Sequence, residues 1–229
     1  RFIAFSSNRN LTDLNPDRNF EIFIIDTTNS LVTQLTHTSG LNAAKNPKIS
    51  GDGNTVAYIA DNNLSRELVL CSRAGTQSIR VIAGGLSAIS MASGRTISDD
   101  GLRVIYSAET APDATQLFLW DGRNDVTRQL TNLETREDDV SLQATISGDG
   151  MRVAFATRRD VIGGNSDHSV ELYVLDLPSG QIESITSAPA SATAEVVSSL
   201  NDNGSQLAFS FPRVHSGPVS SNLLAGGTR

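Results

Sequence analysis

A short turn sequence recurs four times along this chain, and the same apolar pattern follows it each time. The turn reads Ser-x-Asp-Gly in three copies and Asn-Asp-Asn-Gly in the fourth, and its final glycines stand 48, 49 and 54 residues apart. An aromatic residue always lies five positions after the glycine. The four turns are 50–53, 98–101, 147–150 and 201–204, and the aromatic residues are Tyr58, Tyr106, Phe155 and Phe209. A period of this size is typical of stacked or radial repeat proteins.

Short apolar runs between turn residues predict four strands in each unit. One run precedes the turn, one contains the aromatic residue, and two more follow after a loop and a reversal, as in residues 171–176 and around Ile185. Runs of this length, rich in β-branched and aromatic residues, are typical of strands. The turns between them suit tight reversals. Each unit of about 50 residues is therefore predicted to be a four-stranded antiparallel meander.

The strand after each turn is apolar on both faces, which predicts that the units pack against each other. Val153 and Phe155 point to one side of such a strand, and Ala154 and Ala156 point to the other. A strand that is buried on both faces needs a neighbour on each. Four-stranded units packed face to face around an axis form a β-propeller, so we expect an all-β propeller. A parallel β-solenoid is the alternative, but its rungs are shorter and lack antiparallel hairpins.

Counting strands divides the chain into about four and a half blades within a single propeller. We expect a partial blade at 1–45, complete blades at 46–94, 95–142 and 143–194, and a partial blade at 195–229. Arg1–Phe5 already matches the positions after a turn glycine, so the chain enters within a blade. We expect it to be part of a larger propeller of six to eight blades. A complete small propeller, closed by the last copy, is the alternative.

These units resemble the TolB-like β-propeller repeats, which are related to the WD-repeat class. The resemblance rests on the Ser-x-Asp-Gly turn, on Val153-Ala154-Phe155 after it, on the Leu-Tyr-Val-Leu-Asp run at 172–176, and on Gln-Leu-Thr at 34–36 and 129–131. It covers essentially the whole chain, although the proline that usually precedes the turn survives only as Pro47. The resemblance implies a periplasmic, cell-surface or secreted propeller that binds a partner. It also implies that such a propeller can be the non-catalytic part of a serine peptidase.

Composition excludes some classes of function. The net charge is −7 and the sequence pI is about 4.9, which disfavours nucleic-acid binding because phosphate contacts need clustered Lys and Arg. No apolar run approaches the roughly 18 residues that would predict a membrane span. The single cysteine, Cys71, lies in an apolar strand pattern and is predicted to be a buried hydrophobic residue.

The loops predict which end of the blades carries function. In an antiparallel meander the Ser-x-Asp-Gly turns share one face, here called the turn face, and the loops that follow the aromatic residues share the other, here called the loop face. The distance from the aromatic residue to the next Glu or Gln is 16 residues in the first and fourth copies but 9 and 10 in the others. Variable loops on a rigid scaffold are where binding usually occurs. The long loops, 8–20 and 158–170, are therefore the predicted functional loops.

Oxygen-bearing side chains alternate along both long loops and suggest calcium. Ca²⁺ prefers six to eight oxygen ligands, and alternation lets one loop supply several. The candidate ligands are Asp13, Asn15, Asp17, Asn165 and Asp167, with Asn19, Glu21 and Glu171 beside them. Asp and Asn are also ordinary loop residues that bond to their own backbone, so calcium is a possible cofactor rather than a required one. The acidic run 134–139 would add negative potential to the same face.

No catalytic constellation emerges from the sequence. His37, His168 and His215 lack the spacing of zinc ligands, and the run 166–169 contains Ser, Asp and His without a nucleophile elbow. The glycine pairs at 84–85 and 163–164 do not open helices, so they are not phosphate loops. The repeated aspartate of the turn is explained by the positive φ angles that a hairpin needs.

Three functional hypotheses remain open. The first is a non-enzymatic binding or scaffold propeller that engages a protein, peptide or glycan through the loop face. The second is the regulatory propeller of a larger hydrolase of the serine-peptidase type. The third is a calcium-stabilised propeller enzyme, which would need carboxylates that converge near the axis. Unpaired blade edges would also allow the chain to form oligomers.

Overall fold

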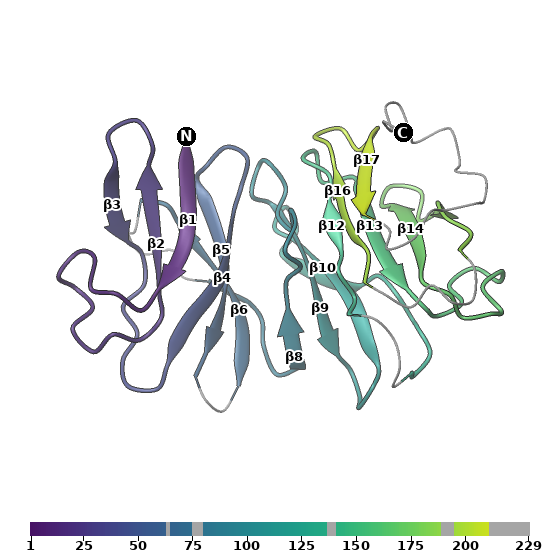
Figure 1. The fold of residues 1–229 in the computed structure, drawn as a ribbon, viewed down its shortest axis with the longest axis horizontal. Helices are drawn as coiled ribbons and strands as arrows, with labels where there is room; N and C mark the ends of the chain where they lie inside the picture. Colours follow the sequence, from purple (N-terminus) through teal and green to yellow (C-terminus); the bar gives the residue numbers. More distant parts are fainter. Residues whose placement is uncertain (63–64, 75–79, 137–140, 189–194, 211–229) are drawn as a thin grey trace.

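Antiparallel sheets stacked in chain order make up the described part of this protein (Figure 1). The computed structural model describes residues 1–62, 65–74, 80–136, 141–188 and 195–210. Each sheet is a meander in which strands that follow each other in sequence also pair. The described part of the chain contains no helix that could cross a membrane.

Five sheets contain the seventeen described strands. The first has β1 (Phe2–Ser7), β2 (Glu21–Asp26) and β3 (Leu31–Gln34). The second has β4 (Ala43–Ile49), β5 (Thr55–Asp61), β6 (Arg66–Ser72) and β7 (Arg80–Ala83). The third has β8 (Ser87–Ser90), β9 (Arg103–Glu109), β10 (Thr115–Asp121) and β11 (Val126–Gln129). The fourth has β12 (Thr145–Ile146), β13 (Arg152–Thr157), β14 (Glu171–Asp176) and β15 (Ile182–Ser184), and the fifth has β16 (Val197–Leu200) and β17 (Leu207–Ser210).

The apolar core lies between the sheets, in four layers, as expected for propeller blades. In β13, Val153 and Phe155 pack against the third sheet, and Ala154 and Ala156 pack against the fifth. Sequence-equivalent residues of β5 and β9 form the layers between the first and second and between the second and third sheets. The antiparallel pairing throughout excludes the parallel solenoid. The predicted all-β fold with four-stranded antiparallel blades is therefore confirmed.

Side-chain hydrogen bonds stabilise each Ser-x-Asp-Gly turn. In the third copy, Ser147 Oγ donates to Asp149 Oδ1 at 2.6 Å, and Asp149 Oδ1 also accepts from the Met151 amide at 2.9 Å. Only the glycine has a positive φ, +72° at Gly150, and the aspartate does not. The expectation that the aspartate serves the positive φ angles of the hairpin was therefore wrong. Its carboxylate is needed instead as a hydrogen-bond acceptor.

Backbone hydrogen bonds connect the turns of successive sheets into a continuous rim. The Asp52 amide donates to the Asp99 carbonyl at 2.9 Å, and the Asp99 amide donates to the Gly148 carbonyl at 2.7 Å. The Asp149 amide then donates to the Asp202 carbonyl at 2.6 Å. Each turn therefore fixes the position of the next sheet as well as the register of its own strands. The turn face is a structural rim.

Two predicted blade boundaries are too late in the sequence. β4 begins at Ala43, before the predicted boundary at 46, and β8 pairs with β9 although it lies before the predicted boundary at 95. In both sheets the first strand contains a register shift, between Lys45 and Lys48 and between Ser87 and Ser90. The irregular stretches hide the strand pattern in the sequence. Residues 211–229, which include His215, and residues 137–139 of the acidic run lie outside the described residues.

The turn carboxylates predict how stability changes in acid. Burial alone would raise the pKa of Asp52 and Asp100, but hydrogen bonds from Ser50 and Asn54, and from Ser98 and Leu102, lower both. A carboxyl with a lowered folded-state pKa stabilises the fold above its unfolded pKa, and that contribution is lost as the pH falls through the folded value.

We therefore expect a double variant, Asp52→Asn with Asp100→Asn, to lose less stability than the native protein between about pH 5 and pH 3. Urea denaturation at both pH values measures the difference. An equal loss in the two proteins would contradict the role assigned to these carboxylates.

Candidate functional site

The two long loops of the loop face have the same backbone conformation. Both take a left-handed residue at the same two places, Asp13 and Gly163 at the first and Arg18 and His168 at the second. Loop 8–20 follows β1 and loop 158–170 follows β13, and each ends at a glutamate that opens the next strand. The loops are thus equivalent parts of the first and fourth repeats, which makes their differences informative.

A buried asparagine holds each long loop together. Asn15 and Asn165 are 1% and 4% exposed, and their Nδ2 atoms donate to the carbonyls of Asn19 and Ser169, both at 2.9 Å. The backbone amides of Asn15 and Asn165 donate to the side chains of Asn10 and Asp160 at the starts of the loops. These two predicted metal ligands therefore also hold the loop conformation.

The other predicted metal ligands, Asp13, Asp17 and Asp167, are exposed. Asp167 Oδ1 accepts from the Ser169 amide at 3.1 Å. Within the described ranges, no three His, Cys, Asp or Glu side chains come together as a metal site would require. Buried Asn15 Oδ1 has no hydrogen-bond partner and could be a ligand oxygen. The calcium site therefore stays a prediction.

Calcium binding is tested by melting the protein in excess Ca²⁺ and in EDTA. A ligand of the native state at about 100 times its dissociation constant would add about 2.7 kcal/mol. For a chain of this size that corresponds to a rise in Tm of roughly 5–10 °C. The variant Asp167→Asn provides a second test, because it should lose part of the Ca²⁺-dependent rise in Tm. Superimposable curves in Ca²⁺ and EDTA would rule out the calcium site.

A glutamate opens the strand that follows each long loop. Its carboxylate accepts a hydrogen bond from a threonine that lies two residues after the end of the next strand. Glu171 Oε2 accepts from Thr186 Oγ1 at 2.5 Å, and Glu171 Oε1 accepts from the Ala188 amide at 2.6 Å and from Ser169 Oγ at 2.9 Å. The same arrangement joins Glu21 to Thr36 and Gln116 to Thr131. This bond is the structural reason for the recurring threonine of the Gln-Leu-Thr sequence.

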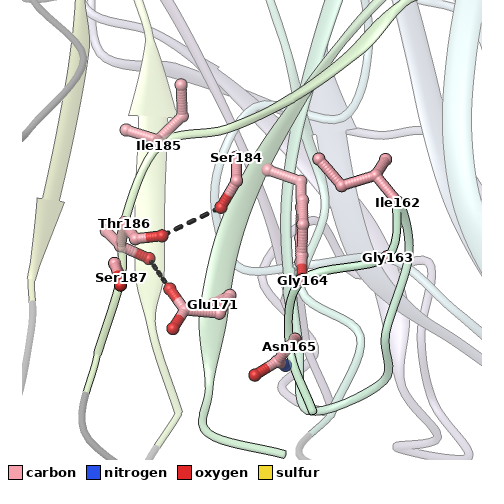
Figure 2. Close-up of a pocket in the computed structure, with 10 residues that line it drawn as sticks. Ile162, Gly163, Gly164, Asn165, Glu171, Ser184, Ile185, Thr186 and Ser187 are labelled. Atoms are coloured by element: carbon pink, nitrogen blue, oxygen red, sulfur yellow. Dashed lines mark hydrogen bonds between the residues drawn. The ribbon is translucent and has the colours of Figure 1, made fainter.

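A pocket lies between the loop 158–170 and the end of β15 (Figure 2). Its volume is about 380 Å³, within the range of small-molecule sites. Ile162, Gly163 and Gly164 form the loop wall, and the opposite wall contains Glu171, Ser184 and Thr186. Asn165, Tyr173, Ile185 and Ser187 complete the lining.

Comparison of equivalent positions explains why the pocket forms in the fourth repeat. Gln34, Gln129 and Ser184 occupy the same place, and each donates to the carbonyl two residues later, of Thr36, Thr131 or Thr186. Serine makes this bond with a much shorter side chain. In the first repeat, Gln34 Oε1 also accepts from Thr12 Oγ1 at 2.9 Å, which ties the loop to the strand. The fourth repeat has Ile162 in place of Thr12. Isoleucine has no hydrogen-bond donor, so the equivalent bond between the loop and the strand at Ser184 cannot form.

Two carboxylates, of Glu171 and Asp160, act on the Tyr173 side chain of the pocket. Burial, together with the charges of these two carboxylates, raises the pKa of Tyr173 to about 12. Asp160 accepts from the amides of Gly163, Gly164 and Asn165, and these bonds lower its pKa. The two glycine amides are therefore bonded to a carboxylate and are not directed at an anion.

The pocket is lined in part by one of the two long loops singled out from the sequence, but the sequence analysis did not single out all of its residues. Asn165 and Glu171 were predicted as possible metal ligands, whereas Ile162 and Ser184 were not singled out. The missing signal was the replacement of glutamine by serine at 184, visible only when the repeats are aligned. Ser166, Asp167 and His168 do not form a catalytic triad with Ser169, since Ser169 Oγ donates to Asn165 and Glu171 while His168 Nδ1 lies 3.3 Å from the Arg158 carbonyl.

Comparison with known proteins identifies the fold. Neither the protein-family models nor the curated protein sequences gave a match. Among solved structures, TolB from Acinetobacter baumannii is similar over 95% of this chain and 48% of its own, with a TM-score of 0.62 and 20% identity. An oligogalacturonate lyase in complex with manganese is similar over 81% of this chain and 51% of its own, with a TM-score of 0.56 and 13% identity.

Solved structures of peptidases are also similar to this chain. An acylaminoacyl peptidase is similar over 91% of this chain and 33% of its own, with a TM-score of 0.54 and 11% identity. The chain spans about half the length of the TolB and lyase structures and a third of the peptidase. At these identities the similarity concerns the fold alone. The chain has a β-propeller fold similar to that of TolB, as the repeats predicted.

Proposed function

We propose that this protein is a non-enzymatic propeller module that binds a protein, peptide or glycan through its loop face. The observation that carries this proposal is the exposure of large apolar side chains on loops of that face. Leu11 and Leu14 are 45% and 59% exposed, Phe20 is 40% exposed, and Leu41 in the neighbouring loop is 80% exposed. Exposed apolar residues gathered on one surface mark interaction sites.

The two neighbouring loops that carry these residues are held rigidly. Asn19 Nδ2 in the first loop donates to Thr38 Oγ1 at 2.7 Å, and the Thr38 amide donates to Glu21 Oε1 at 2.5 Å. The Phe20 carbonyl accepts from the Ala44 amide at 2.7 Å. A loop that is already ordered loses little entropy when it binds, which favours recognition by exposed side chains.

Selection from a displayed peptide library and from a glycan array tests this proposal. We expect the native protein to retain ligands that a loop-face variant, Leu11→Ser with Leu14→Ser and Phe20→Ser, does not retain. The matched control is Leu102→Ser, which changes an exposed leucine on the turn face and should retain the same ligands. Failure to select any ligand, or equal retention by both variants, would refute the proposal.

A second candidate function is the regulatory propeller of a larger hydrolase. The similarity to the acylaminoacyl peptidase supports it, as does a TM-score of 0.56 to a structure of prolyl endopeptidases over 80% of this chain. The full open reading frame separates the two candidates. A downstream α/β-hydrolase domain with its nucleophile elbow would favour the regulatory role.

Two further points belong to the proposal. We place the protein outside the cytoplasm, in the periplasm, on the cell surface or secreted, as the resemblance to TolB-like repeats implies. Fractionation of cells that produce the native gene tests this location. The calcium-stabilised enzyme is the weakest candidate, because in the described residues the carboxylates of the long loops bond to their own loops or face solvent.

A further inference from the structure

The pocket of the fourth repeat offers hydrogen-bond acceptors but few donors. Thr186 Oγ1 gives its proton to Glu171, and Ser184 Oγ gives its proton to the Thr186 carbonyl. Both Asn165 donors are directed at protein carbonyls, of Ser169 at 2.9 Å and Arg158 at 3.2 Å. Each of these side chains keeps a lone pair that can accept another bond. A ligand that fits this lining must supply donors.

Glu171 makes the pocket suited to a cation. Its carboxylate has about four acceptor positions and uses three of them, for Ser169, Thr186 and the Ala188 amide. None of the ten lining residues carries a positive charge. A buried carboxylate that keeps an open acceptor position pairs best with a charged donor, because charge-assisted hydrogen bonds are the strong ones.

One wall also offers apolar surface to an aliphatic stem. This surface is the side chain of Ile162, which is 50% exposed at the rim. A lysine side chain packs its methylene groups along apolar surface and directs its ammonium at polar partners. The ammonium group has three donors and no acceptor, which complements a lining whose main feature is its acceptors.

We propose that this pocket binds a primary ammonium group, with Glu171 as its counter-ion and Ser184, Thr186 and Asn165 as further acceptors (Figure 2). The ammonium can belong to a lysine side chain or to an amino sugar, which are both within the partner classes of the proposed function. This inference rests on the proposed function only in what it says about the macromolecule that carries the ammonium group. The pocket itself can be tested with a small probe.

Equivalent repeats provide two variants that preserve the local fold. Glu171→Gln places in the fourth repeat the residue that the third repeat has as Gln116, where it accepts from Thr131 and from the Leu133 amide. Ser184→Gln introduces the residue that the first and third repeats have at this place, and it fills the space that serine leaves open. The first variant removes the charge, and the second removes the cavity.

The experiment is a titration of the native protein with n-butylammonium chloride, followed by the amide NMR signals of Gly163 and Gly164 at constant ionic strength. We expect saturable shifts with a dissociation constant on the order of 1 mM. The neutral probe 1-butanol should bind at least about tenfold more weakly, because it lacks the charge. Glu171→Gln should weaken butylammonium binding by about tenfold or more, and Ser184→Gln should abolish it.

Equal responses to butylammonium and butanol would overturn the proposal, as would unchanged binding in either variant with an unchanged Tm. Nα-acetyl-lysine amide and glucosamine, each compared with its N-acetylated form, identify which source of the ammonium fits. If library ligands are lost in the loop-face variant but butylammonium does not bind, the ammonium site is wrong and the proposed function stands. If butylammonium binds but no library ligand is selected, the ammonium site stands and the proposed function is wrong.

Discussion

Replacing Phe155 with alanine is expected to destabilise the protein by about 3–5 kcal/mol. The Phe155 side chain is fully buried between the third and fourth sheets, and its ring stacks on Tyr173 with centroids 5.6 Å apart. It packs in the layer that also contains Ile105 and Leu117 from the third sheet. Its removal leaves a cavity that two sheets, each fixed by its own hydrogen bonds, cannot fill. Urea denaturation measures the loss.

Phe5 provides the matched control, because it is the equivalent residue of the first repeat. It stacks on Phe23 at 5.7 Å, as Phe155 stacks on Tyr173, but no described sheet precedes it and its side chain is only partly buried. We expect Phe5→Ala to cost about 1–2 kcal/mol, well below the cost at Phe155. Equal losses at the two positions would contradict the packing of blade on blade.

Replacing Gly148 with alanine is the second large expected effect, a destabilisation of about 1–3 kcal/mol. A Cβ atom at Gly148 would lie 2.2 Å from Asp99 Oδ2, 2.5 Å from Arg95 Nη1 and 2.8 Å from the backbone Cα of Asp202. The two side chains can move, but the backbone of the next turn cannot move without breaking the rim. The substitution also displaces Arg95 from its 2.8 Å bond to Asp202 Oδ1.

Gly164→Ala is the control for this substitution. No atom lies within 4 Å of a Cβ at Gly164, and its φ lies outside the left-handed region. We expect a change within about 0.5 kcal/mol. Thermal and urea denaturation of both variants give the comparison. A Gly148 variant as stable as the Gly164 variant would show that the turns do not fix the position of neighbouring sheets.

The repetition in the sequence predicted most of the fold, and local irregularity limited the rest. The turn, the aromatic residue and the strand that follows recur with constant spacing, so the meander and its packing could be inferred. The first strand of the second sheet could not be bounded, because Asn46 takes a positive φ inside a strand that also contains Pro47. Proline and a left-handed residue are read as a loop when no pairing partner is known.

The candidate site was predicted in part, for a related reason. Loop length identified the loop face, and composition drew attention to Asn165 and Asp167. The pocket, however, depends on a serine at 184 where two other repeats have glutamine, and on the bond that each makes to a carbonyl two residues away. The replacement of a long side chain by a shorter one, which leaves a cavity, cannot be recognised from one repeat alone. Only the alignment of repeats with known contacts reveals it.

Hydrogen exchange of the protein with and without a selected ligand tests most directly the claim that the loop face binds and the turn face supports. We predict slowed exchange in the amides of residues 8–20, 37–42 or 158–170 when the ligand is bound. We predict no change in the turns 50–53, 98–101, 147–150 and 201–204, because their amides bond within the rim and within the turns. Protection of those turns, with none on the loop face, would contradict the account.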